Sequence, residues 1–82
     1  MHELSLMIVE IISDIDKRLR DFDFKRTQID GDIQTIAAIL GDRSDKGAAF
    51  IDHMKMAQDK YRDAIDCLQI AKQRLEYLKG EL

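Results

Sequence analysis

Two series of apolar residues, spaced alternately three and four residues apart, constrain this chain more than any other feature of its sequence. The first series reads Ile8, Ile12, Ile15, Leu19, Phe22, Arg26, Ile29, Ile33, Ile36 and Leu40. The second reads Phe50, Met54, Ala57, Tyr61, Ala64, Leu68, Ala71, Leu75, Leu78 and Leu82. A repeat of about 3.5 residues places such positions along one stripe of an α-helix and is typical of a coiled-coil seam. We call these positions the seam, and they predict two long helices.

The segment between the two series, residues 41–47, is rich in turn-forming residues. Gly41 follows Leu40 as a helix C-cap, and Ser44 or Asp45 is suited to N-cap the next helix. The sequence has no proline, and Gly31 lies inside an otherwise unbroken pattern, at a cost of about 1 kcal/mol. We therefore predict helices over residues 3–40 and 47–79, joined by a turn over 41–47, in a single domain over residues 1–82.

A short connection forces the two helices to run antiparallel. Pairing Leu40 with Phe50 then matches the two seams along their whole length, and this pairing places Arg26 opposite Ala64. The flanks carry two expected ion pairs, Asp16 with Lys72 and Asp32 with Lys60. The predicted fold class is all-α, an antiparallel two-helix coiled-coil hairpin that pairs with another hairpin into a four-helix bundle.

Arg26 is the one seam position that is not apolar. A long side chain can run along apolar surface and carry its charge out to solvent. We expect the guanidinium to reach solvent or the nearby Asp23 and Asp30, and to help fix the register of the seam.

Apolar residues continue outside the seam, so the hairpin is not expected to live alone. On a solvated surface such residues occur singly, whereas a group of them marks a contact. We predict a homodimer or another protein partner, bound through an interface that contains Leu4, Met7, Ile11, Ile39, Ile51, Met56, Ile70 and Tyr77.

Composition narrows the range of functions. The chain has 82 residues and a net charge of −3, which argues against a nucleic acid as its partner. No apolar run is long enough for a membrane span, so no membrane contact is expected. The single cysteine fits either a reducing compartment or a secreted protein and does not decide between them. Because no signal peptide is recognisable, we expect a cytoplasmic location, with signal-independent export left open. No motif predicts a catalytic, cofactor or metal site, so we expect a non-catalytic interaction or assembly module.

Four family resemblances leave alternatives open. The start MHELSLM resembles the HypA family of nickel metallochaperones, which would give His2 a metal role, although the two CxxC pairs of that family are missing. The stretch ILGDRSDKGAAF resembles the turn of the WXG100 family of secreted hairpins, without its tryptophan. The stretch YRDAIDCLQIAKQRL resembles the small co-chaperones of type III secretion needles. A hairpin of this size with a basic stripe resembles the RNA-binding Rop-type hairpins in shape, which implies a nucleic-acid-binding dimer; the stripe consists of Arg18, Lys25, Lys60 and Arg74.

Overall fold

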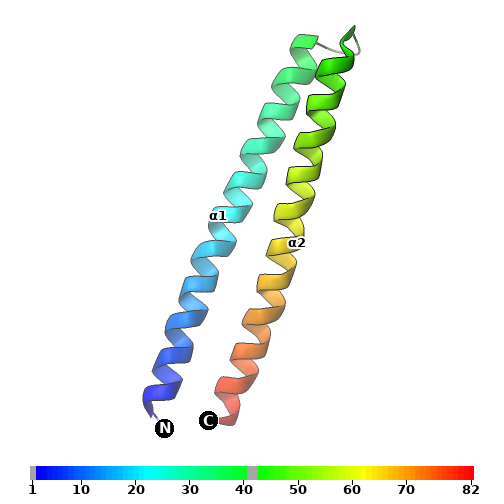
Figure 1. Cartoon of the computed structure of the whole chain (residues 1–82). Helices are drawn as coiled ribbons and strands as arrows, with labels where there is room; N and C mark the ends of the chain where they lie inside the picture. The colour runs from blue at the N-terminus through cyan, green and yellow to red at the C-terminus, as the bar shows by residue number, and fades with distance from the viewer. Residues whose placement is uncertain (1, 41–42) are drawn as a thin grey trace.

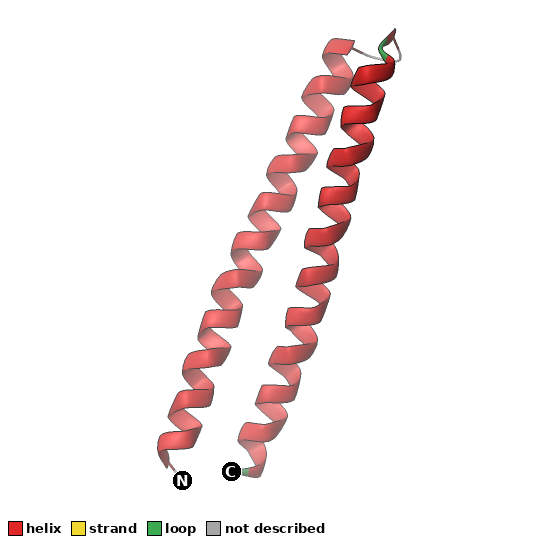
Figure 2. Ribbon diagram, viewed as in Figure 1, coloured by secondary structure: helices red, strands yellow, loops and turns green. Residues whose placement is uncertain are grey.

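Two long α-helices, packed side by side and antiparallel, form a rod of about 62 × 14 × 12 Å (Figure 1). The computed structural model describes residues 2–40 and 43–82. Helix α1 runs over His2–Leu40 and helix α2 over Asp45–Glu81. Within the described residues the chain is helical apart from short loop segments and has no strand (Figure 2). The predicted fold class, an all-α helical hairpin, is confirmed.

Helix α2 begins two residues earlier than the sequence indicated, because Ser44 caps it. Ser44 has extended backbone angles, and its hydroxyl oxygen accepts a hydrogen bond from the backbone N–H of Gly47 at 3.0 Å. This bond satisfies one of the amides that the first helical turn leaves without a partner. Of the two predicted N-caps, Ser44 therefore fills the role and Asp45 becomes the first helical residue. The predicted C-cap, Gly41, lies outside the described residues.

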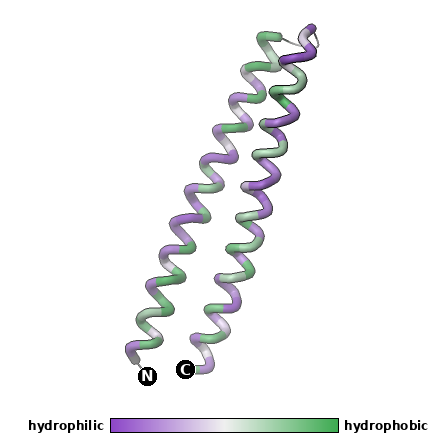
Figure 3. Tube along the Cα trace, viewed as in Figure 1, coloured by the Kyte–Doolittle hydropathy of each residue, from purple (hydrophilic) through white to green (hydrophobic). Residues whose placement is uncertain are grey.

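The seam faces inward along both helices. Every seam residue of α1 is buried or half-buried, and Ile8, Ile15 and Ile33 are the buried apolar side chains of the described chain. The seam of α2 is half-buried from Met54 to Leu75 and exposed at its two ends. Apolar segments recur along both tubes with polar ones between them, as expected for helices that each bury a single stripe (Figure 3).

The predicted stagger between the helices is wrong near the turn. Leu40 lies against Gly47 and not against Phe50: a Cβ atom on Gly47 would lie 2.6 Å from Leu40 Cδ1. Gly47 is buried, whereas Phe50 is exposed. Gly47 precedes Met54 by seven residues, so it occupies a seam position that has no side chain. The seam of α2 therefore starts one step closer to the turn than its apolar residues indicate.

The pairing also differs from the prediction further from the turn. The contact of Asp30 with Gln58, like that of Leu40 with Gly47, shows that α2 is shifted by about two to three residues from the predicted pairing. Arg26 then lies nearer the level of Tyr61 than of Ala64, and the long Gln58 side chain reaches its backbone oxygen. The rings of Phe22 and Tyr61 pack with centroids 5.6 Å apart, where Leu68 had been expected opposite Phe22.

The two expected ion pairs have different outcomes. Lys72 Nζ lies 2.8 Å from Asp16 Oδ1, as predicted. Across residues 2–40 and 43–82, no ion pair joins Asp32 to Lys60. The new stagger brings Asp16 and Lys72 level with each other, and it moves Asp32 and Lys60 further apart along the helices.

In the part of the chain that the structure describes, neither helix is apolar enough over a sufficient length to cross a membrane.

Candidate functional site

The two long faces of the hairpin, one on each side of the seam, differ in chemistry. On one of them, polar side chains connect the helices: Lys72 of α2 pairs with Asp16 of α1, and the Gln58 amide of α2 donates to α1. Asp16 and Asp30 each follow a seam residue directly, as do Gln58 and Lys72, so these side chains flank the same side of the seam. We call this side the bridged face.

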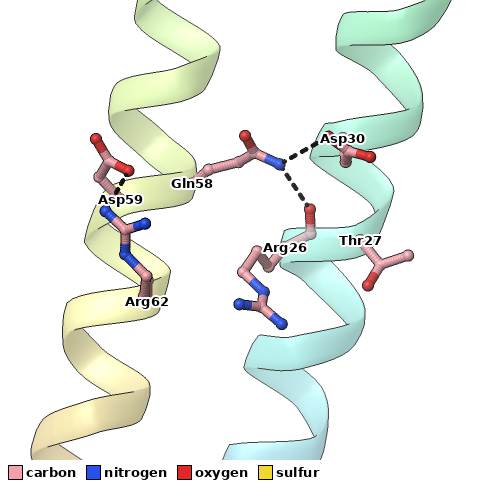
Figure 4. Close-up of a pocket in the computed structure, with 6 residues that line it drawn as sticks. All are labelled: Arg26, Thr27, Asp30, Gln58, Asp59 and Arg62. Carbon is pink, nitrogen blue, oxygen red and sulfur yellow. Dashed lines mark hydrogen bonds and ion pairs between the residues drawn. The ribbon is translucent and has the colours of Figure 1, made fainter.

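Gln58 forms the centre of the bridged face (Figure 4). Its Nε2 atom donates to the backbone oxygen of Arg26 at 3.3 Å and to Asp30 Oδ1 at 3.5 Å. The first bond adds a second donor to a backbone carbonyl of α1. The second bond is so long that it is weak. Gln58 therefore contacts α1 near the middle of the two helices.

A cavity of about 330 Å³ opens to solvent around Gln58, and its lining is charged. The lining residues are Arg26, Thr27, Asp30, Gln58, Asp59 and Arg62 (Figure 4). Both arginines are already paired within their own helices: Arg26 Nη2 lies 2.6 Å from Asp23 Oδ1, and Arg62 Nη2 lies 2.8 Å from Asp59 Oδ1. The positive and negative charges that line the cavity therefore balance, so the cavity does not concentrate charge of one sign.

Arg26 leaves the seam as the sequence predicts. Its guanidinium turns to Asp23, one helical turn earlier, and its side chain keeps 42% of its surface exposed. The carbon stem can cover neighbouring apolar surface while the charge stays hydrated.

Two lysines on the hairpin have a raised pKa. The hydrogen bond from Lys72 to Asp16, followed by the charge of that carboxylate, raises the pKa of Lys72 above 10.5. The hydrogen bond from Lys25 to Asp21 at 3.0 Å raises the pKa of Lys25 in the same way. Both shifts favour the charged form that these lysines already have at neutral pH, so they mark ion pairs and not proton-transfer groups.

The face opposite the bridged face carries exposed apolar side chains from both helices. On α1, Leu4, Ile11 and Ile39 are separated by multiples of seven residues, and Met7 lies one turn before Ile11. On α2, Met56, Ile70 and Tyr77 are separated in the same way. Residues seven apart lie on the same side of a helix after two turns. We call this side the apolar face, defined by Leu4, Met7, Ile11, Ile39, Met56, Ile70 and Tyr77.

All seven residues of the apolar face are exposed, and Ile39 and Tyr77 are the most exposed of them, at 70% and 76%. They gather in two groups. Leu4, Met7 and Ile11 lie near the end of the rod where both termini are found, on the same half as Ile70 and Tyr77, while Ile39 and Met56 lie toward the turn. A hollow of about 460 Å³ beside Tyr77 is lined by Gln73, Arg74, Tyr77, Leu78 and Glu81.

The structure thus places seven of the eight residues predicted to form an interface along one face, in two separate groups, and their role as an interface stays a prediction. Ile51 does not belong with them, because it directly follows the seam residue Phe50 and flanks the bridged face, where it is half-buried. Phe24 was not predicted, and its side chain is 61% exposed. It is a lone aromatic among charged neighbours on the outer side of α1, so no periodic signal could have identified it.

The residues with potential chemistry outside these faces lie apart. Cys67 is an exposed free thiol. His53 is exposed, with Nδ1 3.1 Å from the backbone oxygen of Ala49. The side chain of His2 lies outside the description. Within the described residues, no three His, Cys, Asp or Glu side chains are grouped so that they could hold a metal ion.

No protein-family model matches this chain, and no curated protein or solved structure shows significant similarity to it. The four family resemblances of the sequence therefore gain no support, and the two faces of the hairpin carry the functional argument.

Proposed function

We propose that this hairpin is a non-catalytic protein-interaction module that binds a partner protein through its apolar face. One observation supports this above the others: seven large apolar side chains are exposed along one face, whereas Ile8, Ile15 and Ile33 are the buried apolar side chains of the described chain. An exposed apolar group of this kind marks a contact surface on a small domain.

The energetics of a lone hairpin point in the same direction. Two helices bury one stripe each, and chains of this length are marginally stable when they fold by themselves. Covering the apolar face would contribute about 25 cal/mol for each Å² of apolar area removed from water. A partner would therefore both use the exposed side chains and stabilise the hairpin. The proposal keeps the cytoplasmic location that the sequence predicts.

Charge substitutions on the apolar face test the proposal. Ile70→Asp and Tyr77→Asp place a carboxylate where an apolar contact is proposed, at positions whose exposure leaves the hairpin itself intact. In cells of the native host, cross-linking of the wild-type chain is expected to give a defined product, either with itself or with a second protein. The two variants are expected to lose that product.

Phe24→Asp is the matched control, because it also replaces an exposed aromatic side chain by a carboxylate, outside the apolar face. It is expected to keep the cross-linked product. Circular dichroism of all three variants verifies that each remains helical. A cross-linked product that survives Ile70→Asp and Tyr77→Asp would contradict the proposal.

A further inference from the structure

We propose that the partner of the apolar face is a second copy of this chain, bound about a two-fold axis parallel to the helices. In this arrangement α1 of each copy packs antiparallel against α2 of the other, and the four helices form a bundle. This inference rests on the proposed function and specifies the occupant of the apolar face. Its support comes from the stagger of the helices and from the charges that the stagger brings to the same level.

A two-fold axis parallel to the rod fixes the stagger between copies. Rotation about such an axis leaves every residue at its own height, so α1 meets α2 of the second copy with the offset found inside one hairpin. The contact between Asp16 and Lys72 at 2.8 Å measures that offset. A residue that follows Asp16 by a given number of positions along α1 is therefore at the same height as the residue that precedes Lys72 by that number along α2.

This offset brings opposite charges together on the apolar face. Asp14 precedes Asp16 by two residues and Arg74 follows Lys72 by two, so Asp14 is level with Arg74 of the second copy. Lys25 follows Asp16 by nine residues and Asp63 precedes Lys72 by nine, so these two are level as well. Because the axis is two-fold, each pair occurs twice in the dimer.

One apolar pair also forms with the same offset. Ile11 becomes level with Tyr77 of the second copy, and the hollow beside Tyr77 provides space for an aliphatic side chain. Between the charged pairs, Arg18 is level with Ile70 and Asp21 with Cys67, so no like charges meet. Like charges placed opposite each other across an interface would oppose association, and their absence here favours this arrangement.

The charges concerned are available in the single hairpin. Among residues 2–40 and 43–82, Asp14, Asp63 and Arg74 form no ion pair, and Lys25 pairs with the exposed Asp21 on its own helix. The cross-helix polar contacts that the structure records lie on the bridged face. On the apolar face of the described chain, therefore, the charged side chains of one helix form no ion pair with the other helix.

A two-fold axis perpendicular to the helices fits the charges less well. It would place α1 against α1 of the second copy, running in the opposite direction. When the rods overlap fully, Arg18 then becomes level with Lys25, and Ile11 with Asp32. The first is a like-charge pair, which the two-fold axis would repeat, whereas the parallel axis brings no like charges on the apolar face to the same level, so we infer the parallel axis.

Charge reversal with rescue tests the pairing of Asp14 with Arg74. Sedimentation equilibrium of the purified wild-type chain across the micromolar range is expected to show a species of twice the 9.5 kDa chain mass. Asp14→Arg and Arg74→Asp should each weaken dimerisation about tenfold or more, because like charges then meet twice in each dimer. The double variant, which carries both changes, should restore wild-type dimerisation. Asp66→Arg, the same reversal at an exposed position elsewhere on α2, should leave dimerisation unchanged.

Cys67 supplies an independent readout in the unmodified protein. It is the single cysteine of the chain, is exposed in the hairpin, and lies on the side of α2 that the second copy would cover. Its alkylation by iodoacetamide should slow as the protein concentration rises into the range where the dimer forms.

Three results would overturn the proposal: a chain that stays monomeric, a double variant that fails to restore the dimer, or a dimer in which Cys67 remains fully reactive. If the chain is monomeric while Ile70→Asp and Tyr77→Asp still abolish cross-linking to a second protein in cells, the homodimer is excluded and the proposed function stands. If those variants leave the cellular product unchanged as well, both proposals fail.

Discussion

The ammonium of Lys72 on α2 lies 2.8 Å from a carboxylate oxygen of Asp16 on α1, and this ion pair joins the two helices on the bridged face. Both side chains are about one third exposed, so water weakens the attraction between them. The contact nevertheless marks the level at which the two helices meet.

Asp16→Asn should lower the melting temperature slightly, and added salt should reduce the difference from wild type. The sign of the pH dependence follows from the raised pKa of Lys72. A pKa raised by folding contributes stability that is present below the unfolded value of 10.5 and is lost as the pH rises through the folded value. Alkaline unfolding of wild type should therefore show a component that Asp16→Asn lacks. Asp66→Asn, at an exposed position of α2, is the control and should behave as wild type.

Gly31 and Gly47 should respond to alanine in opposite directions. At Gly31 a Cβ atom would meet nothing within 4 Å, so Gly31→Ala should raise the unfolding free energy by about 0.5–1 kcal/mol through its higher helix propensity. At Gly47 the new Cβ would lie 2.6 Å from Leu40 Cδ1, and the leucine would have to turn away. Gly47→Ala should therefore lose stability in urea denaturation. An equal gain from both substitutions would show that α1 and α2 do not approach closely at Gly47.

The glycine at position 47 also explains which part of the fold the sequence could predict. The apolar spacing predicts the seam of α1, whose residues are all buried or half-buried. The sequence also predicts that the charge of Arg26 leaves the seam for solvent or for Asp23 and Asp30, and the structure pairs it with Asp23. The stagger could not be predicted in this way, because the seam position nearest the turn on α2 is Gly47 and a glycine contributes no hydrophobic signal. Phe50 was consequently taken as the first residue of that seam.

The candidate site, too, could be predicted only in part from the sequence. Spacing by seven predicts that Ile70 and Tyr77 share one side of α2, and both are exposed there. Spacing alone does not show which side of the hairpin is closed by polar contacts, because the Gln58 amide reaches a backbone oxygen of the other helix. Ile51 was grouped with the interface because it lies at the turn end, although its place directly after Phe50 puts it beside the bridged face.

Loss of the Ser44 hydroxyl should destabilise the start of α2. Its oxygen accepts the Gly47 N–H at 3.0 Å, and replacing such an N-cap by alanine costs about 1 kcal/mol. Ser44→Asp should keep most of the stability, because a carboxylate accepts the same bond. Ser13→Ala, at an exposed position within α1, is the control and should not destabilise the hairpin. Chemical denaturation gives the three values, and equal stability of Ser44→Ala and wild type would contradict the cap.

Truncation of a buried seam residue should cost far more than truncation of an exposed one. Ile33 keeps 9% of its surface exposed, so Ile33→Ala should lower the unfolding free energy by about 2–4 kcal/mol, a large share of the stability of a small domain. Phe24→Ala removes a larger side chain at a position that is 61% exposed and should change stability little. Thermal unfolding followed by circular dichroism compares them. A larger loss from Phe24→Ala would show that Phe24 is covered in solution.

Arg26→Leu should raise the melting temperature. Arg26 occupies a seam position, and its guanidinium pairs with Asp23 on its own helix. Leucine would add apolar contact between the helices and contribute about 1 kcal/mol when partly buried. It would also remove a polar residue that restricts the register, so sedimentation should show a less uniform oligomeric state. Arg20→Leu introduces the same side chain at an exposed position of α1 and should not raise the melting temperature to the same extent. A marked loss of stability in Arg26→Leu alone would mean that the Arg26–Asp23 pair stabilises the hairpin more than an apolar seam residue can.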